Sequence, residues 1–179
     1  MEEYLEPYKW THLSDIVEIS ENLKQQAGNF RIRDEISKPR HVFLFMINTE
    51  NINDQTKNPF IYNTFEFPNL PNKNLTLNRY YLAVGNGNEY PTLHYKPTED
   101  MARIFRDVMS YVYANNDFQG GTMLNRTNFE SLFPFIYFDL TKQKLDIKDG
   151  VTKLVFHYEI SGKTKNNYNI HALILSTKR

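Results

Sequence analysis

The sequence predicts an all-β domain, an antiparallel β-sandwich or jelly roll of about eight short strands with one inserted α-helix. Apolar runs rich in β-branched and aromatic residues, turn residues at hairpin spacing and a single segment of helical period lead to this fold class. The clearest runs are HVFLFMI at 41–47, FPFIYFDL at 133–140, KLVFHYEI at 153–160 and IHALIL at 170–175. The first of these is apolar on both faces, so we expect it to be a central, covered strand.

The remaining strands are expected from alternation and turn chemistry. FRIRDEI at 30–36 and FIYNTFEF at 60–67 alternate apolar and polar residues, as half-exposed strands do. A further strand at 75–84 runs into Gly85-Asn86-Gly87-Asn88, whose glycines can supply the positive φ angles of a hairpin turn. A strand is then expected to restart near Glu89-Tyr90-Pro91.

Two segments predict helices. Between Thr98 and Ala114, apolar residues recur at helical spacing, at positions 101, 104, 105, 108, 109 and 112. Thr98 is the expected N-cap of this helix. Residues 1–29 are interpreted as an N-terminal arm with a short helix from Asp15 to Gln26, ahead of a single jelly-roll domain over 30–179.

Composition argues against several functional classes. Lys plus Arg and Asp plus Glu both number 21 among 179 residues, so net charge gives no case for binding nucleic acid, and weak long-range repulsion favours self-association. The absence of cysteine excludes disulfides and thiolate metal sites. The sequence shows no signal core and no apolar run of the ~20 residues that span a membrane. We therefore expect that the protein does not insert into a membrane and that it is made in the cytosol or nucleus.

A metal site can be imagined on the expected strands. If the strands of His157 and His171 are neighbours, both imidazoles and Asp139 can meet on one face as ligands. Ordinary strand-surface histidines are the favoured interpretation, because no short spacing such as H-x-x-x-H occurs. His94 and His41 have no partner identifiable from the sequence. No metal and no cofactor are therefore assigned.

The acidic candidates for catalysis also have simpler interpretations. Asp139 can be an acid of raised pKa, but a strand-end Asp more often accepts backbone N–H bonds. Glu99 and Asp100 suit the positive end of the helix dipole, and Asp107 is expected on the solvated helix face. Gly85-Asn86-Gly87 does not match a phosphate loop, because no helix follows it at once. No catalytic residue is assigned, and we expect no enzyme.

A basic cluster is the remaining candidate for nucleic-acid contact. Lysines gather in the C-terminal third of the sequence and can meet phosphates if their loops share one end of the sandwich. They are Lys142, Lys144, Lys148, Lys153, Lys163, Lys165 and Lys178, with Arg179. Interleaved Asp146, Asp149 and Glu159 favour a solvated loop face instead, and no specific nucleic-acid site is expected.

Five segments together resemble a known family. They are Lys38 to Phe43, Thr56 to Phe60, Glu89-Tyr90-Pro91, the helix through Ile104-Phe105, and Leu132 to Gln143, which contains F-D-L-T-K-Q. These segments are similar to one jelly roll of the double jelly-roll major capsid proteins of adintoviruses and Polinton (Maverick) elements. The strands at 154–160 and 169–175 continue the likeness, so it covers roughly residues 30–176.

The resemblance implies an eight-stranded antiparallel roll with a helix in a connecting loop, and a viral structural protein found in the virion after assembly in the host cytoplasm or nucleus. In that family two rolls share one chain and three chains form a capsomer. A chain of 179 residues holds one roll. The resemblance therefore implies a fragment, a single-roll relative that completes itself by oligomerising, or a host-captured descendant.

The leading hypothesis is a self-assembling capsid subunit, with trimers or higher oligomers of itself and minor capsid proteins as partners. The alternative is a monomeric β-sandwich module that binds carbohydrate or protein through Tyr80, Tyr81, Tyr90 and Tyr95 as a stacking platform. An enzyme on a cupin-like roll is disfavoured, because it needs clustered metal-binding histidines.

Overall fold

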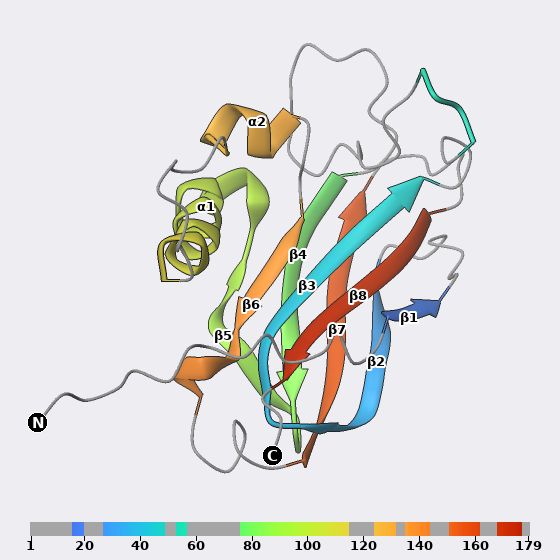
Figure 1. Ribbon diagram of the computed structural model, residues 1–179, viewed down its shortest axis with the longest axis vertical. Helices are drawn as coiled ribbons and strands as arrows, with labels where there is room; N and C mark the ends of the chain where they lie inside the picture. Colours follow the sequence, from blue (N-terminus) through green and yellow to red (C-terminus); the bar gives the residue numbers. More distant parts are fainter. Residues whose placement is uncertain are drawn as a thin grey trace, which may run out of the picture.

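The computed structural model describes residues 16–19, 27–48, 53–56, 76–114, 124–131, 135–143, 151–161 and 168–176. Within these ranges the chain is mostly β, with two antiparallel sheets and helices along one side (Figure 1). The expected all-β sandwich is confirmed. The expected strand at 60–67 lies outside the described residues.

Sheet A has the strand order β1-β8-β3-β6. Its strands are β1 (Ile16–Ile19), β8 (Tyr168–Ser176), β3 (Pro39–Asn48) and β6 (Ile136–Asp139). The doubly apolar run at 41–47 lies in β3, which pairs with β8 on one side and β6 on the other. The expectation of a central strand is therefore confirmed.

Sheet B has the strand order β2-β7-β4-β5. Its strands are β2 (Ala27–Ser37), β7 (Val151–Ser161), β4 (Thr76–Val84) and β5 (Asn88–Tyr95). β4 and β5 form the expected hairpin, and its turn has Gly85 at φ 63° and Gly87 at φ 93°. Glycine suits both positions because a side chain disfavours positive φ.

The core lies between the two sheets and is strongly aromatic. Phe138 of β6 is fully buried and contacts the rings of Tyr80, Tyr95 and Phe156 from sheet B, with centroids 5.9 to 6.3 Å apart. Each sheet contributes alternate residues to this layer, as Val42, Leu44 and Met46 do from β3. Because a large buried side chain contributes about 1.5–3 kcal/mol, this layer holds the sheets together.

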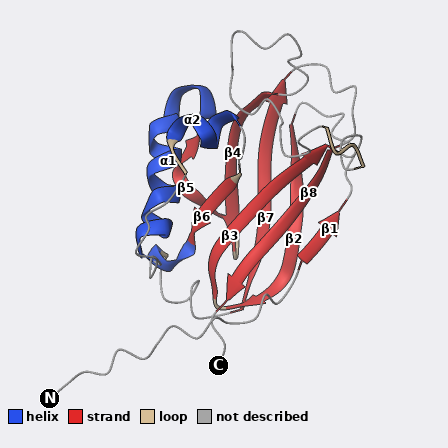
Figure 2. Cartoon of the chain, turned by 45° about the horizontal axis from the view of Figure 1, so that its top comes forward, coloured by secondary structure: helices blue, strands red, loops and turns tan. Residues whose placement is uncertain are grey.

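The helices lie together along the side of the sandwich where β5 and β6 are the edge strands (Figure 2). α1 (Pro97–Ala114) buries Met101, Ile104, Val108 and Met109 at the expected helical spacing, and α2 (Arg126–Ser131) follows it. Thr98 is not the N-cap, because the helix begins at Pro97. The Lys96 carbonyl accepts the N–H groups of Glu99 and Asp100, and the Asp100 carboxylate accepts the Lys96 N–H at 3.2 Å.

Two expectations about local structure were wrong. The helix predicted from Asp15 to Gln26 is contradicted at Ile16–Ile19, which pairs with β8 as strand β1. The backbone bonds of sheet A prevail there over local helical periodicity, and β2 starts at Ala27, so both sheets begin upstream of residue 30. Of the strand expected at 133–140, the structure describes Ile136–Asp139 as β6, which ends before the expected Leu140 because a 3-10 turn begins there; residues 133 and 134 lie outside the described ranges.

Candidate interaction surfaces

A stack of three rings crosses the outer face of sheet B. Tyr81 of β4 lies between His94 of β5 and His157 of β7, with centroid distances of 4.0 and 4.7 Å and interplanar angles of 11° and 2°. Tyr81 and His157 are direct cross-strand partners, so the register of β4 and β7 produces the second contact. The Glu89 carboxylate and the His94 Nε2 form a hydrogen bond of 2.8 Å. Both faces of the tyrosine are therefore covered by imidazoles.

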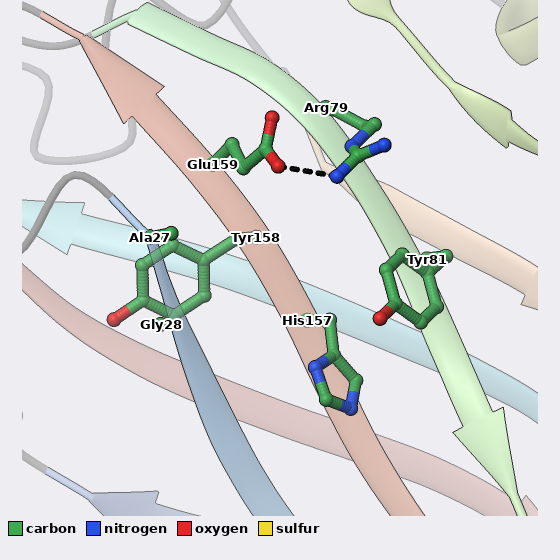
Figure 3. A pocket seen from close by; sticks show the side chains of 7 residues that line it. All are labelled: Ala27, Gly28, Arg79, Tyr81, His157, Tyr158 and Glu159. Atoms are coloured by element: carbon green, nitrogen blue, oxygen red, sulfur yellow. Dashed lines mark hydrogen bonds and ion pairs between the residues drawn. The ribbon is translucent and has the colours of Figure 1, made fainter. Parts of the chain in front are cut away.

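A hollow of about 130 Å³ lies beside this stack. Its lining comes from β2, β7 and β4 and consists of Ala27, Gly28, Arg79, Tyr81, His157, Tyr158 and Glu159 (Figure 3). Arg79 and Glu159 form an ion pair at one end, while Tyr81 and His157 form the other. The hollow on the outer face of sheet B therefore has an ion pair on one side and two aromatic rings on the other.

The environment of the stack shifts two ionisable groups. Burial lowers the pKa of His157, with Glu89 opposing and His94 adding to the shift. Burial also raises the pKa of Tyr81, and the nearby carboxylates of Glu89 and Glu159 act in the same direction against Arg79. Both shifts favour the neutral forms of the His157 imidazole and the Tyr81 phenol near neutral pH.

A second polar group lies where α1 meets the edges of both sheets. The Tyr95 hydroxyl of β5 donates to Asp107 of α1 at 2.7 Å, and the Arg103 guanidinium lies 4.4 Å from the Tyr95 ring centroid. His41 Nδ1 and the Tyr137 hydroxyl share a hydrogen bond of 2.9 Å. These contacts tie β3, β5, β6 and α1 together at one side of the sandwich.

The tyrosines of this group are held in their neutral form. Burial raises the pKa values of Tyr95 and Tyr137 far above the ordinary value for tyrosine, and it raises the pKa of Tyr90 to about 12. Burial also lowers the pKa of His41, although Asp139 opposes the shift. Phenols held neutral in this way are poor nucleophiles and good hydrogen-bond donors, so the geometry serves to fix α1 in place.

The outer face of sheet A is largely apolar, and among the described residues α1 packs over one half of it. Tyr111 of α1 packs over the half made by β3 and β6, with ring centroids 4.7 Å from His41, 5.1 Å from Phe43 and 5.4 Å from Tyr137. The half made by β3 and β8 presents half-exposed apolar side chains, namely Phe45, Ile47, Leu173 and Leu175. Such a surface is suited to contact with another protein surface.

The structure separates the residues of the imagined metal site. His157 lies in sheet B, whereas His171 and Asp139 lie in sheet A, so the strands of the two histidines are not neighbours. No group of three or more His, Cys, Asp or Glu side chains suited to a metal occurs within the described ranges. Asp139 accepts the Thr141 N–H at 3.0 Å, which confirms the strand-end interpretation.

Other sequence candidates fall into different places. Asp107 was expected on the solvated helix face, but it accepts the Tyr95 hydroxyl in a partly buried position. Tyr80 and Tyr95 belong to the core, so the platform of four tyrosines is wrong. Of the basic cluster, Lys142 pairs with Asp139 at 3.5 Å and Lys153 is exposed, and the other members lie outside the described residues.

The ring stack and the Arg79–Glu159 pair were missed from the sequence. The Tyr81–His157 contact and the ion pair both form across β4 and β7, whose residues are about 80 positions apart in the chain. The available signal was polar residues at alternate positions of two apolar strands, Tyr81 and Arg79 in one and His157 and Glu159 in the other. Alternation shows that they share the outer side of each strand, but only the register shows which residues meet.

Comparisons with protein-family models, with curated proteins and with solved structures find no match for this chain. No helix within the described residues is long and apolar enough to cross a membrane.

Proposed function

We propose that this protein is a capsid-type structural subunit, an eight-stranded jelly roll that works by assembling with copies of itself into a capsomer or virion shell. The order of strands in the two sheets is the observation that carries the proposal. β8 lies between β1 and β3, and β7 lies between β2 and β4. This alternation of early and late strands is what two Greek keys wound into a jelly roll require, and viral capsid proteins are prominent among jelly-roll proteins.

Two further observations support this proposal. α1 and α2 are inserted between β5 and β6, which agrees with the helix that the capsid resemblance implies in a connecting loop. The half-exposed residues Phe45, Ile47, Leu173 and Leu175 offer apolar contact area on sheet A, and a formal net charge of zero leaves little repulsion between copies. Partners of the subunit are copies of itself, as trimers or higher oligomers, with minor capsid proteins beside them.

The monomeric binding module stays as the alternative outcome. Its proposed tyrosine platform is lost, because Tyr80 and Tyr95 face the core. Within the described residues, the hollow beside Tyr81 is another surface that a binding module can use. A volume of about 130 Å³ is below the ~300–1,000 Å³ of typical ligand pockets, so this surface does not favour a small-molecule function.

The proposal can be tested by measuring the mass of the protein at several concentrations with size exclusion coupled to light scattering. Electron microscopy of the concentrated protein follows. The expected result is a mass that rises to a defined multiple of the 21.3 kDa chain and then to larger symmetric particles. A strictly monomeric chain at every salt concentration and pH would contradict the proposal and favour the binding module.

A further inference from the structure

We infer that two copies of this chain meet edge to edge through the first half of β2, so that sheet B continues across a two-fold axis into sheet B of the partner. This inference rests on the proposed function, because it names one contact through which the subunits associate. It concerns the stretch from Ala27 to Arg31, which we call the β2 edge.

The β2 edge is the longest regular free edge among the described strands. β2 and β5 are the edge strands of sheet B, and β1 and β6 those of sheet A. β1 and β6 have only four residues each, and the register of β5 shifts after its first three paired residues. The β2 edge pairs with β7 without interruption over five residues, and bulges begin only after Arg31. Free edges template pairing unless bulges or short strands block them.

The side chains of the β2 edge are compatible with antiparallel pairing to a second copy. Ala27, Asn29 and Arg31 are exposed, whereas Phe30 is buried in the core. With a two-fold axis at Asn29, each Arg31 stands opposite Ala27 of the other copy, so no like charges face each other. The two Asn29 amides meet at the axis, where each can donate and accept a hydrogen bond.

Charge complementarity extends this pairing into the hollow. Arg79, Glu159 and Ala27 are consecutive cross-strand neighbours on β4, β7 and β2. The partner's Arg31, placed opposite Ala27, would be the next residue in this row. Its Cα would lie about 10 Å from that of Glu159, two strand spacings away, and only a methyl side chain would stand between them. The long arginine can therefore cross Ala27 and place Glu159 between two guanidinium groups.

A five-residue ladder buries less than the roughly 1,000 Å² that a stable, specific interface needs. The contact is therefore weak in an isolated pair and gains strength where other symmetric contacts of an assembly hold the copies together. A covalent trap is accordingly the most direct test.

The chain contains no cysteine, so one introduced cysteine reports unambiguously. In an antiparallel pair, directly opposed Cα atoms are ~4.5–5.5 Å apart, which suits a disulfide. Asn29→Cys is expected to form a linked dimer on mild oxidation, as seen by non-reducing electrophoresis. Thr92→Cys, exposed on the other edge strand of the same sheet, is the matched control and is expected to stay unlinked.

A charge reversal tests the row of ionic side chains. Arg31→Glu would bring a carboxylate toward Glu159 of the other copy, and we expect self-association to weaken by about tenfold or more in sedimentation velocity. Lys153→Glu makes the same change of charge at another exposed position of sheet B and should leave association within about twofold. Thermal unfolding of each variant confirms that it is folded.

The outcomes separate this inference from the proposed function. Equal linking of the two cysteine variants, or association unchanged by Arg31→Glu relative to Lys153→Glu, in a chain that still forms oligomers would overturn the β2 contact and leave the capsid proposal standing. A chain that stays monomeric and unlinked under all conditions would overturn both. Selective linking through Asn29→Cys together with weakening by Arg31→Glu supports the β2 contact.

Discussion

The two long sides of the sandwich differ in what lies against their edge strands. On the side of β5 and β6, α1 packs against the sheet edges and is fixed by Tyr111, by the Tyr95–Asp107 hydrogen bond and by rings around Tyr137. We call this the closed side. On the side of β2, the strand carries the exposed residues Ala27 and Asn29, one small and one polar. We call this the open side.

The difference separates residues that hold the chain folded from residues that are available to a neighbour. Aromatic packing on the closed side connects directly to the core through Phe138. The exposed side chains of the open side remove little apolar surface from water, so they contribute little to the stability of a single chain. We therefore expect mutations on the closed side to affect unfolding and mutations on the open side to affect association.

The largest effect is expected from Phe138→Ala. Phe138 is fully buried and contacts rings from both β5 and β7, so its removal leaves a cavity where the sheets meet. We expect a loss of about 3–5 kcal/mol in the free energy of unfolding, measured by urea denaturation. Asn29→Ala on the open side is the matched control and should stay within about 0.5 kcal/mol of wild type. Similar losses in both variants would contradict the division between the two sides.

Gly28 is an expected exception on the open side. A Cβ at this position would lie 2.4 Å from the Tyr158 hydroxyl oxygen and 2.5 Å from its Cζ, both of which belong to a nearly buried ring. Gly28→Ala should therefore destabilise the chain by about 1–3 kcal/mol through overpacking. Because Tyr158→Leu removes both atoms, the double variant should lose less than the sum of the single losses in a double-mutant cycle. Additive losses would show that the ring does not cause the cost.

The smallest effect is expected when the pH is lowered, because stability then depends on one histidine near the closed side and one near the open side. Burial lowers the pKa values of His41 and His157 below 6.5 in the folded chain, so the unfolded chain binds more protons as the pH falls below that value. Stability should therefore fall as the pH decreases from about 7 through 6.5 toward the folded pKa values. Urea denaturation at several pH values should show a shallower pH dependence in His41→Gln and His157→Gln. An unchanged slope in both would show that other groups control it.

Much of the fold could be predicted from the sequence, because most strands, the long helix and the hairpin turn are specified by residues close together in the chain. Apolar runs rich in β-branched and aromatic residues placed β3, β7 and β8 close to their observed bounds, turn residues placed the end of β4, and helical spacing placed α1 within one residue. The glycines of the hairpin turn were equally clear. β1 was missed because a four-residue strand is stabilised by its pairing with β8 and has almost no periodicity of its own.

The surfaces were harder to predict, because they depend on register and on contacts between distant elements. Nothing near Asp107 in the helix indicates that Tyr95 of the preceding strand reaches it. Nothing near Tyr81 indicates that His157 stacks on it, since the pairing of β4 with β7 is set by the whole sandwich. Strand faces can therefore be inferred from a sequence of this kind, whereas the partners on each face require the tertiary structure.

The positions of β7 and β8 have a consequence for synthesis. These last two strands, Val151–Ser161 and Tyr168–Ser176, separate the earlier strands within both sheets. A nascent chain that ends before Val151 can form the β4–β5 hairpin but has no β7 to join β2 to β4 and no β8 to join β1 to β3. The two sheets can therefore close only after β7 and β8 have emerged from the ribosome, and until then the edges of the earlier strands are unpaired and prone to aggregate.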